Sequence, residues 1–160
     1  MSEEDKEFQE YELFAKRMEE QFPKMFGGRY GGFSCGSGWW PLLEQLCASI
    51  QSHIDWKNET RERLLKDNPH QHAVPDAVTQ VTIEQIKEKF GTLRFYYQGG
   101  DEYIHGAVSL AERLTNHLCE TCGGLGKRRS GGWIRTLCDV HEAEHTARQE
   151  KYAKENGLEL

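Results

Sequence analysis

Apolar side chains near the start of the chain recur at helical intervals. Within residues 4–26 they stand three or four positions apart, which predicts an amphipathic helix closed by Pro23. They are Phe8, Tyr11, Phe14 (or Ala15), Met18 and Phe22. A second helix is expected from Trp39 to about Leu65, because Pro41 suits a first turn and an apolar stripe follows. That stripe comprises Leu42, Leu43, Leu46, Ile50 and Ile54.

Between these two helices, residues 27–38 contain six glycines in twelve positions. A glycine-rich loop before a helix can hold phosphate on its backbone amides. However, the stretch has neither a G-x-G-x-x-G pattern nor the Lys-Ser/Thr pair of a Walker motif. We therefore interpret it as a connector.

Residues 78–98 predict an antiparallel hairpin. In the second half apolar and polar positions alternate, with Leu93, Phe95 and Tyr97 on one face and Arg94 and Tyr96 on the other. The first half, 79–90, allows two interpretations. Its β-branched residues favour a strand, whereas Ile83, Ile86 and Phe90 have helical spacing. We predict a strand that turns within 87–91, with a helix as the alternative.

A third helix is expected after Asp101, a good N-cap residue. Its apolar positions run on to Leu118, so the pattern predicts a helix that leads directly into Cys119. The apolar positions are Ile104, Ala107, Val108, Ala111, Leu114 and Leu118.

The strongest chemical signal follows. Cys119 and Cys122 form a C-x2-C pair, and after fifteen residues Cys138 and His141 form a C-x2-H pair. This spacing is typical of a closed, structural zinc site with three thiolates and one imidazole. Glycines after the first pair and a helical pattern after the second predict a treble-clef-like finger. His145, one turn further on, remains an alternative fourth ligand.

His141 to His145 also matches the H-E-x-x-H motif of zinc proteases. Such a site needs a third protein ligand from further along the chain. Only fifteen residues follow His145, and Cys138 accounts for His141 as a finger ligand. No Ser/His/Asp grouping can be placed. We therefore expect a non-enzymatic protein, with a metal-dependent hydrolase as the minority interpretation.

Length, composition and charge indicate the class of protein. The chain has 160 residues, 37% of them apolar, and a net charge of −6, which disfavours a generic nucleic-acid coat. We expect an α+β fold made of an N-terminal helix (1–30), a core (31–118) and the zinc finger with its helix (119–160), all in one compact unit. With no signal peptide and no apolar run of membrane-spanning length, a cytoplasmic protein is expected.

Basic and aromatic residues suggest where a ligand could bind. We predict a basic, aromatic pocket in an otherwise acidic protein, because cations beside aromatic rings suit phosphate contact and stacking. The candidates are Lys87, Arg94 and Tyr96 of the hairpin and Lys127, Arg128, Arg129, Trp133 and Arg135 of the finger. The alternative is a solvated sheet face and a loop whose Trp133 covers a small finger core.

Several motifs together resemble a family of small bacteriophage and prophage proteins. They are Lys-Phe-Gly-Thr-Leu-Arg-Phe-Tyr-Tyr at 89–97, Ala111-Glu112, Cys119-Glu-x-Cys122-Gly and Trp133-Ile-Arg-Thr-Leu-Cys138-Asp-x-His141. The resemblance implies action in the host-cell cytoplasm by binding, either to a host protein or to an anionic nucleotide-type signalling ligand. The alternative is a DNA- or RNA-binding regulator that uses the finger. Neither the residues nor the resemblance indicates an oligomeric state.

Overall fold

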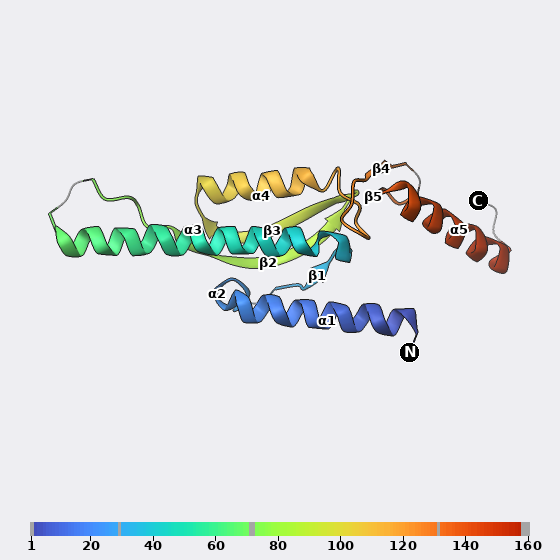
Figure 1. Cartoon of the computed structure of the whole chain (residues 1–160), viewed down its shortest axis with the longest axis horizontal. Helices are drawn as coiled ribbons and strands as arrows, with labels where there is room; N and C mark the ends of the chain where they lie inside the picture. The colour runs from blue at the N-terminus through green and yellow to red at the C-terminus, as the bar shows by residue number, and fades with distance from the viewer. Residues whose placement is uncertain (1, 29, 71–72, 131, 158–160) are drawn as a thin grey trace.

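A mixed three-stranded sheet lies at the centre of the computed structural model, which describes residues 2–28, 30–70, 73–130 and 132–157 (Figure 1). The strand order is β1 (Phe33–Ser34), β2 (Thr79–Lys89) and β3 (Thr92–Gly100), with β1 parallel and β3 antiparallel to β2. The predicted hairpin is confirmed. Its two-residue turn has positive φ at Phe90 (55°) and Gly91 (78°), as the twist of paired strands favours.

The alternative helix over 79–90 is wrong, and an irregularity in β2 explains the helical spacing. Val81, Ile83 and Ile86 are all buried, although the last two stand three residues apart. The register with β3 shifts between Ile83 and Gln85, so one extra residue returns Ile86 to the buried face. The bulge therefore imitates the spacing of a helix.

Two helices, α3 (Trp40–Asp67) and α4 (Glu102–Leu114), pack against each other and against β2 and β3. Helix α3 extends two residues beyond the predicted end and follows a short 3-10 turn, η1 (Ser37–Trp39). Its apolar stripe enters the core as predicted, together with the fully buried thiol of Cys47.

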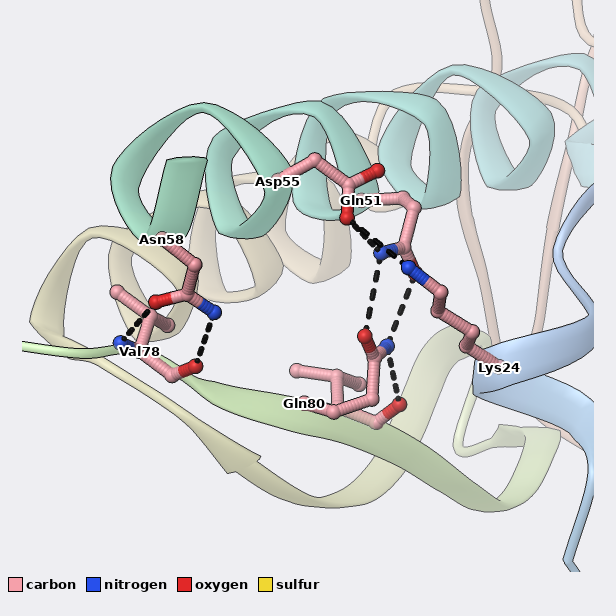
Figure 2. Close-up of polar contacts among 7 residues, drawn as sticks. Lys24, Gln51, Asp55, Asn58, Val78 and Gln80 are labelled. Atoms are coloured by element: carbon pink, nitrogen blue, oxygen red, sulfur yellow. Dashed lines mark hydrogen bonds and ion pairs between the residues drawn. The ribbon is translucent and has the colours of Figure 1, made fainter. Parts of the chain in front are cut away.

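Polar side chains of α3 bind the start of β2 (Figure 2). The Asn58 amide donates to the Val78 carbonyl and accepts from the Val78 N–H, both at 2.9 Å. Further along, the amides of Gln51 and Gln80 exchange hydrogen bonds of 3.2 and 2.9 Å. These bonds satisfy polar groups where the first residues of the strand pass under the helix.

The N-terminal segment forms two helices rather than one. Helix α1 (Glu3–Gln21) ends at Phe22, and Pro23 begins the short α2 (Pro23–Phe26), because proline fits a first helical turn but not a helix interior. Phe14 is buried and stacks on Trp40 with ring centroids 4.5 Å apart. In contrast, Phe8 is 61% exposed, so its predicted place in the apolar stripe is wrong.

Helix α4 begins as predicted, since the Asp101 carboxylate accepts a hydrogen bond from the Ile104 N–H. The predicted continuation into Cys119 is wrong. The helix ends at Leu114, where the Thr115 hydroxyl donates to the Glu112 carbonyl. Beyond it the chain turns, and Leu118 forms an isolated antiparallel bridge with Leu125.

The last part of the chain contains a two-stranded hairpin and a helix. Strands β4 (Lys127–Arg129) and β5 (Arg135–Leu137) pair antiparallel, and α5 (Asp139–Asn156) ends at Gly157 in the left-handed conformation. The result is a mixed helix and sheet protein with α5 at the right of Figure 1. None of the helices within the described ranges combines the length and apolarity of a membrane span.

Candidate metal centre

Three thiols and one imidazole converge near the C-terminus. The ligand atoms of Cys119, Cys122, Cys138 and His141 all lie within 4.8 Å of one another. His141 Nδ1 is 3.1 Å from Cys138 Sγ and 3.5 Å from Cys119 Sγ. The four side chains could hold a metal ion, and His141 is the histidine of the cluster. His145 instead lines a neighbouring cavity.

Two local structures place these ligands. The Cys119 N–H donates to the Gly124 carbonyl (2.7 Å), and the Gly123 N–H donates to the Cys119 carbonyl (2.8 Å). Gly123 has a φ of 72°, which glycine adopts without strain. The second pair lies at the start of α5, with Cys138 as its N-cap. A helix N-terminus favours the thiolate form that binds metal.

The backbone of the turn from Cys119 to Gly124, here called the knuckle, also favours ionisation of one thiol. Burial opposes ionisation of Cys119, but hydrogen bonds from the N–H groups of Cys138, Cys122 and Thr121 outweigh it and lower its pKa to about 6. At Cys122 the Gly124 N–H favours the thiolate. There, desolvation and the neighbouring Cys119 outweigh that bond and raise the pKa. A positive charge beside these two thiols, such as a metal ion supplies, would favour their ionisation together.

The glycine-rich segment holds the knuckle against the core, a role that its sequence did not indicate. The N–H of Gly38 donates to the Glu120 carbonyl at 2.8 Å, and the indole of Trp39 donates to the Leu118 carbonyl at 3.0 Å. A Cβ at Gly38 would lie 2.5 Å from the Cys119 carbonyl oxygen. Glycine is therefore needed here for close backbone approach as well as for connection.

The hairpin turn of the core makes a second contact with the metal module, residues 118–141. The buried hydroxyl of Thr136 in β5 donates to the Gly91 carbonyl at 2.7 Å. Nearby, the guanidinium of Arg135 lies 3.5 Å from the carboxylate of Glu120. Burial raises the pKa of that carboxyl, although Arg135 acts in the opposite direction. The 89–97 motif and the Trp133–His141 motif thus meet in space.

The predicted ligand-binding residues do not gather in one pocket. Lys127 and Arg129 pair with Asp139 at 3.2 and 2.6 Å, and Arg135 pairs with Glu120 as described above. The ammonium of Lys87 lies 5.2 Å from the ring centroid of Tyr96, in a shallow depression of its own. The Trp133 side chain is 69% exposed.

Two of the predicted residues do meet. Arg94 of β3 and Arg128 of β4 line one depression of about 570 Å³, and Arg113 of α4 joins them. Within the described part of the chain, none of the three guanidinium groups has a carboxylate within 4.0 Å. Glu112 also lines the depression, where its carboxylate accepts the Phe95 N–H. Arg113 could not be selected from its sequence position, because only the fold brings it to the same depression as Arg128.

A histidine–aspartate pair was also missed. His53 Nε2 lies 2.8 Å from the Asp101 carboxylate, and the His53 ring stacks on Tyr103 at 4.2 Å. Burial raises the pKa of Asp101, but the bonds from His53 and the Ile104 N–H lower it more, so the net shift is downward. The pair joins α3 to the start of α4.

No protein-family model, curated protein or solved structure matches the chain. Its function is therefore inferred from its own residues.

Proposed function

We propose that this chain is a non-enzymatic, zinc-stabilised binding protein of bacteriophage or prophage type that sequesters or masks a host factor. Knuckle, hairpin and helix follow one another in the order of a treble-clef finger. Three cysteines and one histidine suit tetrahedral Zn²⁺, and four protein ligands leave no open position for catalysis. The zinc is structural in this proposal, and the binding surface lies elsewhere.

The observation that carries the binding function is the convergence of three arginines from three elements. Guanidinium groups hold phosphate oxygens in paired hydrogen bonds. Arg94, Arg113 and Arg128 line one depression without a close carboxylate partner among the described residues. The aromatic ring of Phe90 lines it too and is 60% exposed. This arrangement suits an anionic, nucleotide-type ligand with more than one phosphate.

The rival function, a DNA- or RNA-binding regulator, needs a broad positive surface. Lys127, Arg129 and Arg135 would be its natural contributors on the finger. Each of them pairs with Asp139 or Glu120, and the whole chain carries a charge of −6. The depression with three arginines therefore favours a small anion over a nucleic-acid duplex.

The test is calorimetric titration of the full chain with pyrophosphate and with ADP. Replacing Arg94 and Arg128 together by Ala should weaken binding roughly 100-fold, because two charge-assisted contacts are lost. The melting temperature should change little, since both side chains are at least partly exposed. The matched control, Arg63→Ala with Lys66→Ala, makes the same change in charge on exposed residues of α3.

Unaltered pyrophosphate binding in the Arg94/Arg128 variant would contradict the proposed site. A titration with duplex DNA over a range of salt concentrations tests the rival, nucleic-acid-binding function. Tight binding that falls steeply with salt would favour the nucleic-acid function instead.

A further inference from the structure

A cavity of about 1010 Å³ lies apart from the proposed anion site, the depression lined by Arg94, Arg113 and Arg128. It lies between α1, α5, the segment that follows β1 and the metal module, and His141 of the metal cluster contributes to its wall. Its volume is at the upper end of the range of small-molecule sites. None of Arg94, Arg113 and Arg128 lines it.

The two helices give the cavity walls of opposite charge. Glu7 and Glu10 line it from α1, and His145 and Arg148 line it from α5. Positions 141, 145, 148 and 152 recur at helical spacing, so one face of α5 turns toward the cavity. Within the described ranges, neither Glu7 nor Glu10 has a cation within 4.0 Å, and Arg148 has no carboxylate.

Aromatic side chains line the same cavity. They are Tyr11 of α1, Tyr152 of α5 and Trp40 at the start of α3, and Tyr152 is 63% exposed. Leu137 adds a buried apolar surface. Apolar and aromatic surface with a small number of polar groups is the usual lining of a small-molecule site.

A ligand that uses all these groups needs a hydrogen-bond donor for the acidic residues of α1, an aromatic ring for the aromatic side chains and an acidic group for the basic residues of α5. A free amino acid does not fit, because its amine and its carboxylate are attached to the same carbon. A nucleotide fits when its base carries an exocyclic amine. We propose that this cavity binds a nucleoside phosphate of that kind, with the amine on Glu7 and Glu10 and the phosphate on His145 and Arg148.

This second site goes beyond the proposed function, since it uses different residues and also binds the base of the nucleotide. The anion site binds phosphate groups regardless of the base. The cavity distinguishes bases by their amine, because a carboxylate accepts a hydrogen bond from AMP that the carbonyl of IMP cannot donate.

The experiment titrates the metal-loaded full chain with AMP, IMP and adenosine. AMP should bind about tenfold more tightly than IMP, as expected for one charge-assisted hydrogen bond, and more tightly than adenosine. Replacing Glu7 and Glu10 together by Gln should abolish the preference for AMP over IMP. Arg148→Gln should weaken AMP about tenfold and leave adenosine unchanged.

Two control variants make the outcomes distinct. Glu12→Gln with Glu20→Gln makes the same charge change on α1 at residues that do not line the cavity, and this variant should still prefer AMP over IMP. The variant with Arg94 and Arg128 replaced by Ala should also prefer AMP over IMP. Loss of AMP binding in that variant would place the nucleotide in the anion site, overturning the cavity inference and supporting the proposed function.

Three other results would overturn the inference. They are the absence of AMP binding at about 1 mM, equal affinities of the unaltered chain for AMP and IMP, and a preference that survives in the Glu7/Glu10 variant.

Discussion

At the scale of single residues, the metal centre depends on which histidine completes it. The histidine at 141 lies in the first turn of α5, and its Nδ1 is 3.1 Å from the sulfur of Cys138. The histidine at 145 lies one turn later and outside the cluster. The protease-like H-E-x-x-H match therefore contributes one ligand to the cluster instead of two.

We expect His141→Ala to weaken zinc binding roughly 100-fold or more. Zinc-finger sites bind with about 10–16 kcal/mol, and one of four ligands accounts for about a quarter of that. His145→Ala should keep the affinity of the unaltered chain. Competition with a chromophoric chelator measures the zinc dissociation constants of both variants. Equal losses in the two variants would mean that both histidines share the metal.

A second prediction at this scale concerns acid. In the folded chain the pKa of the Asp101 carboxyl lies below its ordinary value of 3.8. The ionised carboxylate therefore stabilises the fold above pH 3.8, and this stabilisation is lost as the pH falls through the folded-state pKa. Asp101→Asn keeps the N-cap but weakens the contact with His53. We expect a loss of about 1 kcal/mol at pH values above about 5 and a smaller loss near pH 3.

Urea unfolding at several pH values measures that difference. Asp76→Asn, at an exposed position, is the matched control and should change stability little at every pH. A difference between Asp101→Asn and the unaltered chain that stays constant with pH would exclude the shifted carboxyl as its cause.

Residue spacing along the chain predicted the four metal-cluster residues, because each C-x2-C or C-x2-H pair is a local signal. Partners distant in sequence were not predictable in the same way. His53 contacts Asp101 across 48 positions, and Arg113 and Arg128 line one depression although they come from different elements. Such pairs depend on the packing of whole elements.

At the scale of elements, the glycine-rich segment fits closely against the knuckle. Gly38 approaches the backbone of Cys119, Cys122 and Gly123, so any side chain there would collide with main-chain atoms. Gly38→Ala should therefore destabilise the chain by roughly 2–4 kcal/mol, within the range of strongly destabilising packing changes.

Gly106→Ala is the matched control in α4. Nothing lies within 4 Å of a Cβ there, and alanine is the better helix former, so stability should rise by about 0.5–1 kcal/mol. Thermal melts of the two variants make the comparison. A melt of Gly38→Ala equal to that of the unaltered chain would show that the segment does not dock on the knuckle.

Helices and strands were predictable where apolar positions followed a single periodicity along the chain. β3 and α3 follow strict patterns and were placed correctly. In β2 the bulge gave buried residues a spacing of three, and in α4 the apolar pattern continued past the Thr115 cap. Hydrophobic spacing reports which residues are buried, but it does not report where the backbone leaves its regular path.

At the scale of the whole molecule, the metal module is attached to the core at two separate places. The knuckle contacts the segment around Gly38, and Thr136 bonds to the turn at Gly91. A metal that stabilises the module should therefore stabilise the core as well. We expect removal of the metal by a chelator to lower the melting temperature of the whole chain in one cooperative transition.

Native mass spectrometry of the unaltered chain and of Cys122→Ser measures whether the cluster of Cys119, Cys122, Cys138 and His141 holds a metal ion. A structural zinc site should give one zinc per compact chain, lost on acid denaturation, and an unfolded or metal-free Cys122→Ser variant. A compact, metal-free unaltered chain whose melt equals that of Cys122→Ser would exclude such a site.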